Sequence, residues 1–179
     1  MSTLVLKGDI SGFTKLQAKD EASCKILKLP NTANFKWESY AIVLDKKNSD
    51  TSSGTFTRGA WETRDLITKT DIDNIISLSN NQFTLGVGTY LIKWSAPAYN
   101  VDGHQTRLRN MSDLTTDIVG SSESNNSRSF GVGVITILEN KTFEIQHRAE
   151  TTVNNNGFGF NLDFGENNIF TVVEVYKES

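Results

Sequence analysis

Hydrophobic and polar residues alternate along several stretches of the chain with the period of a β-strand. The clearest stretch is GTYLIKWSAPAY, residues 88–99, in which Lys93 and Ser95 separate apolar positions. Side chains of a strand point alternately to its two faces, so this stretch predicts a strand with one buried face. Pro97 has no N–H to donate, which predicts an edge, a bulge or a bend at that end. The predicted buried face consists of Tyr90, Ile92, Trp94, Ala96 and Ala98.

Three further stretches have strand character. KTFEIQHRAE (141–150) alternates and places His147 on its more apolar face, while NIFTVVEVYKE (168–178) is apolar on both faces. In SFGVGVITI (129–137), apolar residues lie opposite Gly131 and Gly133, which predicts a bulge or a close approach of another backbone. We interpret Trp94 and Phe130 as core residues.

Composition supports an all-β fold. The chain has 179 residues with 2 prolines and 13 glycines, and clusters of Asn, Asp, Ser and Gly separate the strand patterns. Short strands joined by such turns predict an antiparallel sandwich or barrel. We divide the chain into an N-terminal stem or attachment arm, residues 1–50, and a head domain, residues 51–179.

Charge and cysteine content exclude several classes of function. The net charge of -3 disfavours a nucleic-acid partner, and a single cysteine excludes a disulfide within the chain. No apolar run reaches the roughly 18 residues of a membrane span, and the N-terminus lacks a signal-peptide pattern. We therefore expect no membrane insertion and synthesis in the cytoplasm. No cofactor or metal site is predicted, although Asp163, Glu166 and Asn167 leave calcium open as an alternative.

Two phrases, HQTRLRN and IQHRAE, each place a histidine near an arginine. One interpretation is a structural polar cluster in which imidazoles are fixed by hydrogen bonds and arginines pair with carboxylates such as Asp102, Glu144 or Glu150. The other is a subunit interface, where the planar guanidinium suits buried pairing. A catalytic centre is a third possibility, but no nucleophile motif accompanies these residues and none is predicted to be catalytic. The cluster comprises His104, Arg107, Gln146, His147 and Arg148.

Several phrases, taken in order, resemble the head domain of bacteriophage tail-fibre and other virion fibre proteins. They are GTYLIKW, SAPAY, HQTRL, QHRAE and TVVEV, and GAWETRDLIT resembles the opening segment of these heads. The likeness covers about residues 54–177, and such heads are similar to the jelly-roll heads of the first complement component and tumour necrosis factor. The resemblance implies an antiparallel jelly-roll sandwich of about ten strands that assembles as a homotrimer.

The resemblance implies a viral structural protein without enzymatic activity, located on the tail or capsid surface of a virion. The stem would contact other virion proteins, and loops at the tip of the head would bind a host surface glycan or receptor. A purely structural capsid decoration or trimerisation cap is the alternative, and a polysaccharide-degrading enzyme is a third. The predicted ligand-binding residues are Asn100, Asp102, Asn125, Asn126, Asn154, Asn155, Asn156 and Phe158.

Overall fold

The computed structural model describes residues 3–7, 13–17 and 37–178, with the side chains of residues 39–178. Contacts divide the chain into two compact units, Met1–Asn34 and Phe35–Ser179. In the first unit, β1 (Thr3–Lys7) pairs antiparallel with β2 (Phe13–Gln17). The remainder of residues 1–36, which makes up most of the predicted stem, lies outside the described residues.

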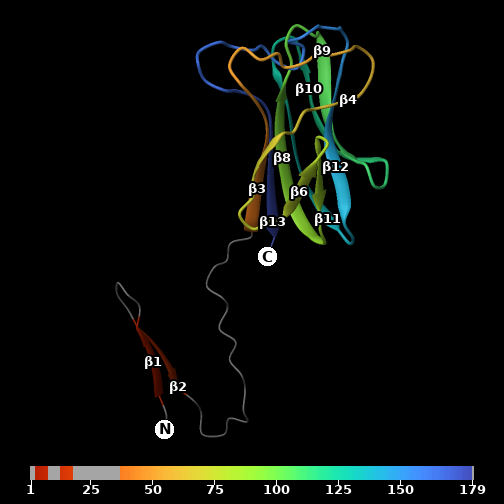
Figure 1. The fold of residues 1–179 in the computed structure, drawn as a ribbon. Coiled ribbons are helices and arrows are strands. Elements are labelled where there is room, and N and C mark those ends of the chain that lie inside the picture. The colour runs from red at the N-terminus through yellow and green to blue at the C-terminus, as the bar shows by residue number, and fades with distance from the viewer. Residues whose placement is uncertain (1–2, 8–12, 18–36, 179) are drawn as a thin grey trace. The chain divides into compact units, whose positions relative to one another are not determined.

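The second unit consists of two antiparallel sheets (Figure 1). One sheet has the strand order β10-β9-β12-β7-β6, with β4 paired to β12, and the other has the order β11-β8-β13-β3-β5. The described residues form no helix, and therefore none that could span a membrane. The strands are β3 (Trp37–Lys47), β4 (Glu62–Thr63), β5 (Thr68–Thr70), β6 (Ile76–Ser79), β7 (Gln82–Leu85), β8 (Gly88–Pro97), β9 (Gly103–Asn110), β10 (Thr115–Ser124), β11 (Arg128–Ile137), β12 (Lys141–Ala149) and β13 (Asn168–Glu178).

The chain crosses between the sheets repeatedly from β8 onward. β8, β11 and β13 belong to the five-stranded sheet, whereas β9, β10 and β12 belong to the six-stranded sheet. This alternation is that of a jelly-roll sandwich, so the predicted all-β antiparallel fold class is confirmed. β8 ends at Pro97, as the missing N–H predicts. The homotrimer stays a prediction.

The head begins earlier in the chain than residue 51. Strand β3 pairs with β13 from the partners Trp37 and Glu178 to Lys47 and Asn168, so it is a full member of the five-stranded sheet. The compact units divide between Asn34 and Phe35. The signal for this earlier start is the alternation in β3, whose residues Ala41 and Val43 are both fully buried on its inner face.

The core fills the space between the two sheets. The predicted inner face of β8 is buried from Tyr90 to Ala98, and the apolar face of β12, including His147, is buried as well. Each large apolar side chain removed from water in this way contributes about 1.5–3 kcal/mol to folding. The residues that meet these two strands from other elements include Val43, Phe83, Leu85, Leu108, Val173 and Val175.

The buried and exposed faces of strand β11 are the reverse of our expectation. Phe130 is 55% exposed and Val132 is 63% exposed, so the prediction that Phe130 belongs to the core is wrong. The inner positions are Gly131 and Gly133 because other side chains already occupy the space there. A Cβ on Gly131 would lie 1.9 Å from the ring of Trp94. The close contacts at Gly131 and Gly133 come from the side chains of Trp94 and Ile118, instead of the predicted backbone or bulge, and they reverse the faces of the strand.

We expect Gly131→Ala to lower the free energy of unfolding by about 1–3 kcal/mol, because the added methyl group must displace the indole of Trp94. Gly86→Ala is the matched control, since a Cβ there meets only the Asn140 Oδ1 at 3.7 Å. Urea unfolding of both variants at one protein concentration measures the difference. Equal stability of the two variants would contradict the packing of Trp94 against β11.

Candidate functional site

The three loops predicted to form the tip lie together at one end of the sandwich. The Asn125 N–H donates to the Asp102 carbonyl at 2.8 Å, and the Asn100 N–H donates to the Asn126 Oδ1 at 2.7 Å. The third loop joins them through the Tyr99 N–H and the Gly157 carbonyl, 3.1 Å apart. The β8–β9, β10–β11 and β12–β13 connections thus form one continuous surface.

Backbone geometry accounts for half of the predicted loop residues. Asn100, Asp102, Asn125 and Asn155 have φ angles of 56°, 59°, 56° and 65°, in the left-handed region. Asn and Asp tolerate this region better than other non-glycine residues, because their short polar side chains bond locally to the backbone. Their residue type is thus explained by turn formation. Of the remaining candidates, Asn154 is exposed and Asn156 is half-buried.

Phe158 does not present its ring to solvent as expected for a recognition residue. Its ring packs against the ring of Phe56, 4.7 Å away between centroids, and against the guanidinium of Arg64 at 4.3 Å. The exposed aromatic residues of this connection are Phe160 and Phe164, which are 53% and 78% exposed, and the ring of Phe160 lies 4.8 Å from the ring of Tyr99.

Arg64 is fully buried directly beneath the loops. Its Nε donates to the Thr171 Oγ1 at 2.9 Å, its Nη1 to the Pro97 carbonyl at 3.3 Å and its Nη2 to the Phe158 carbonyl at 2.8 Å. Burial lowers the pKa of Arg64 to about 9, and the buried Asp45 partly offsets this effect. The guanidinium therefore stays charged at neutral pH and joins three separate segments.

His104 and His147 lie between the two sheets of one chain and bond to each other. The His104 Nδ1 and the His147 Nε2 are 2.9 Å apart, and the His104 Nε2 lies 3.0 Å from the Ser127 Oγ. The His147 Nδ1 is buried without a hydrogen-bond partner among the described residues. Burial, together with the positive charge of Arg64 and the neighbouring His104, lowers the pKa of His147 to about 2. Both rings are therefore neutral near pH 7, and burial also lowers the pKa of His104.

Arg107 and Arg148, the other charged residues of the predicted cluster, face outward from the six-stranded sheet. Arg107 donates twice to the Gln146 Oε1, at 2.8 and 2.6 Å, and its guanidinium covers the ring of Trp61 at 4.1 Å. Arg148 is exposed, and neither arginine forms an ion pair with a described carboxylate. The expected pairing of these arginines with carboxylates is wrong. For Arg107, the side-chain amide oxygen of Gln146 is the acceptor instead.

A groove runs beside Arg148 at the loop end of the six-stranded sheet, and its volume is about 700 Å³. We call it the Trp61 groove. The segment before β4 forms one wall, held to the end of β12 by the Gly59 N–H and the Ala149 carbonyl at 3.0 Å. The principal lining side chains are Arg58, Trp61, Gln105, Glu123, Arg148 and Glu150. Arg58 and Glu123 belong to no recognisable motif, so neither could be predicted as a site residue from the sequence.

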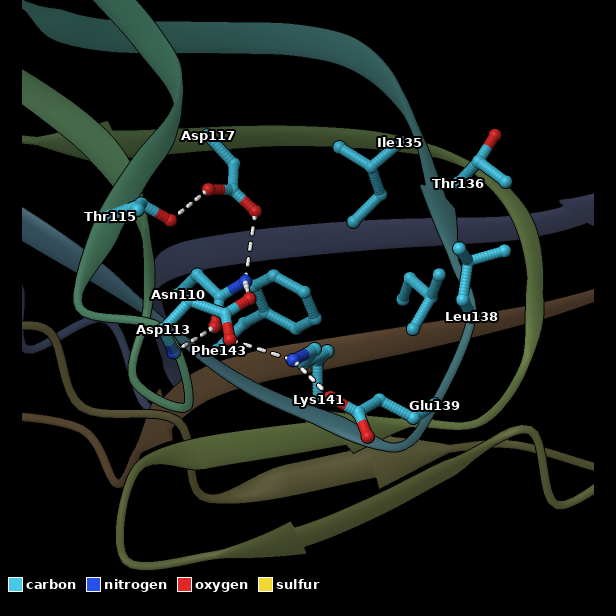
Figure 2. Close-up of a pocket in the computed structure, with 11 residues that line it drawn as sticks. Asn110, Asp113, Thr115, Asp117, Ile135, Thr136, Leu138, Glu139, Lys141 and Phe143 are labelled. Carbon is cyan, nitrogen blue, oxygen red and sulfur yellow. Dashed lines mark hydrogen bonds and ion pairs between the residues drawn. The ribbon is translucent and has the colours of Figure 1, made fainter.

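A second hollow of about 420 Å³ lies at the opposite ends of β9, β10, β11 and β12. Figure 2 shows Lys141 between Asp113 and Glu139, with 2.7 Å from its Nζ to a carboxylate oxygen of each. These hydrogen bonds raise the pKa of Lys141. Lys141 thus pairs with two of the three carboxylates of this hollow, and the third, Asp117, accepts hydrogen bonds from the Asn110 Nδ2 and the Thr115 Oγ1. Among the described residues, no three His, Cys, Asp or Glu side chains gather as a metal site.

Comparison with known proteins finds no matching family and no matching curated protein. Among solved structures, the chain is similar to crystal structures of murine APRIL at pH 8.5, 8.0 and 5.0, each with 10% sequence identity. The TM-scores are 0.46, 0.47 and 0.45, and the matches cover 77%, 78% and 77% of this chain and 98% of each APRIL chain. At this level the likeness concerns the arrangement of strands and carries no information on ligand or assembly.

We expect acid to destabilise the protein through His147. Its pKa is about 2 in the folded state and near 6.5 when unfolded, so below pH 6.5 the unfolded state binds the additional proton. Stability from this group is therefore lost as pH falls. Between about pH 7 and about pH 5 the wild type should lose about 2 kcal/mol more unfolding free energy than His147→Gln.

The His147→Gln variant serves as the reference because protonation of Asp45 changes the stability in the direction opposite to that of His147. Burial raises the pKa of Asp45 to about 6, with Lys47 opposing, so its folded-state protonation stabilises the protein as pH falls below that value. This contribution is common to both proteins and cancels in the comparison. Parallel pH profiles in urea unfolding would mean that His147 is protonated in the folded state.

Proposed function

We propose that the chain is a non-enzymatic viral structural protein whose head assembles as a homotrimer and binds a host cell surface through its loop end. The stem, residues 1–36 in the light of the observed boundary, would contact other virion proteins. The proposal rests on the ordered sequence phrases that resemble virion fibre heads. The structural observation that carries it is an apolar surface on the outer face of the five-stranded sheet.

This outer face presents apolar side chains from four adjacent strands. Val134, Leu91, Tyr176 and Tyr40 are successive cross-strand partners and form one continuous row. Val134 is 56% exposed and Tyr40 is 47% exposed. A soluble monomer rarely leaves a contiguous apolar surface of this kind in water. Toward the Pro97 end of β8 the same face also carries Val132, Ile42, Phe130, Val172 and Leu44.

A threefold assembly would remove this face from water and leave the loops free. On this face, β8 and β13 carry one ion pair among the described residues, between Lys93 and Glu174 at 3.9 Å. The proposed interface does not include His104 or His147, because both histidines lie inside one chain. Three copies of one weak site would raise avidity toward a repetitive cell surface.

We expect the wild type to have a solution mass near three times 19.9 kDa and Val134→Glu to be monomeric. The substitution costs little in a protomer because the side chain is exposed, but in a trimer it buries a charge. Leu114→Glu, at a residue 64% exposed in the β9–β10 turn, is the control and should leave the trimer intact. Light scattering measures all three, and a monomeric wild type would overturn the assembly.

A capsid decoration or trimerisation cap is a second candidate function. The observation in its favour is that four of the eight predicted loop residues have left-handed backbone conformations, so turn geometry alone explains their identity.

Cell adsorption separates the two functions. For a host-binding head, we expect labelled trimer to adsorb saturably to some members of a panel of encapsulated and unencapsulated bacteria. If the receptor is a glycan, treatment of those cells with polysaccharide-degrading enzymes should abolish the adsorption. A trimer that labels no member of the panel would favour the cap.

A further inference from the structure

We infer that the Trp61 groove binds an acidic saccharide, stacking a sugar ring on Trp61 and holding a carboxylate with Arg58 and Arg148. This inference rests on the proposed function, since it names the class of surface glycan. It places the contact beside the loops, on the outer face of the six-stranded sheet.

The aromatic floor of the groove is held rigidly. The guanidinium of Arg107 covers one face of the Trp61 ring at 4.1 Å. Arg107 itself is clamped by two hydrogen bonds to the Gln146 Oε1, and its Nη1 donates to the Thr116 Oγ1 at 3.2 Å. The amide of Gln146 in turn donates to the buried Glu144 at 2.5 Å. A preorganised ring loses little conformational entropy when a ligand stacks on it.

The walls carry donors and acceptors on a fixed backbone. The Arg58 N–H donates to the Thr152 Oγ1 at 3.0 Å, and the Glu150 N–H donates to the Gly103 carbonyl at 3.0 Å. Glu150 also accepts from the Gly103 N–H through its Oε2 at 3.1 Å. Guanidinium donors and carboxylate acceptors around an aromatic ring match the apolar face and the hydroxyl groups of a sugar.

The charges favour an anionic sugar. Arg58 and Arg148 take part in no ion pair with the carboxylates of the described residues, so their guanidinium N–H groups are available to a ligand. Beside the groove, burial and the like charges of Arg109 and Arg148 lower the pKa of Arg107, and the charge of Glu144 opposes them. Arginine binds planar carboxylates in a bidentate manner.

A carboxylate suits the groove better than a phosphate monoester. Glu123 and Glu150 line the same groove and would repel a doubly charged group more strongly than a singly charged one. The ligand class is therefore a uronic acid or another carboxylated saccharide.

Calorimetric titration of the intact protein with short uronic-acid oligosaccharides, each paired with its carboxyl-reduced neutral form, tests the inference. We expect at least one uronide to bind and its neutral form to bind at least about tenfold more weakly. Arg58→Gln and Arg148→Gln should each weaken uronide binding by a similar factor. Arg109→Gln is the matched control, because it removes the same charge from the same face outside the groove lining, and it should stay within about twofold.

Each other outcome overturns the inference. Equal binding of the neutral form would exclude carboxylate recognition, and preferential binding of a sugar phosphate monoester would exclude this ligand class. Equal losses in Arg109→Gln and Arg148→Gln would show attraction by the overall field instead of contact in the groove. Absence of uronide binding, with wild type and Arg148→Gln adsorbing equally to cells, would overturn the groove while the proposed function stands. Failure of the proposed function has a different signature, namely a trimer that adsorbs to no cell.

Discussion

The loop end depends on one buried charge, the guanidinium of Arg64. A fully buried arginine is costly to desolvate unless its donors are satisfied. Here the acceptors come from β13, from the end of β8 and from the long β12–β13 connection. Because the acceptors belong to segments far apart in the chain, they can meet the guanidinium together only when the sandwich is closed. The Phe158 ring that covers it then fixes the loop that passes over the top, so the shape of the tip follows from the core.

The two outer faces of the sandwich differ in chemistry. The five-stranded sheet exposes an apolar row, whereas the six-stranded sheet exposes arginines, amides and the half-buried ring of Trp61. The apolar face exists because Trp94 occupies the interior beside Gly131 and turns the larger residues of β11 outward. One side is therefore suited to association with like surfaces and the other to contact with a polar ligand. The proposed assembly and the proposed ligand therefore use different faces of the sandwich and would not compete.

Sequence reasoning predicted the strand periodicity, the sandwich and the meeting of three loops, because alternation and turn composition are local properties. It could not predict which face of β11 is buried, since alternation separates two faces without ranking them and the deciding side chain, Trp94, belongs to another strand. The ring of Phe158 was misplaced for a similar reason: its partners Phe56 and Arg64 lie about a hundred residues earlier in the chain. Of the groove arginines, Arg148 belongs to the predicted cluster and Arg58 belongs to no motif, and the register of β12 with β4 and β9 brings the two walls of the groove together.

The pairing of β3 with β13 has a mechanical consequence. Trp37 and Glu178 are partners at one end of these strands, and Lys47 and Asn168 are partners at the end nearer the loops (Figure 1). A load applied between the loops and residue 37 runs along β3 and stretches the hydrogen bonds of its ladder in parallel. A load between residues 37 and 178 would instead separate the same two strands one bond at a time, which needs much less force. The head is thus expected to resist tension between its loops and residue 37 better than tension between residues 37 and 178.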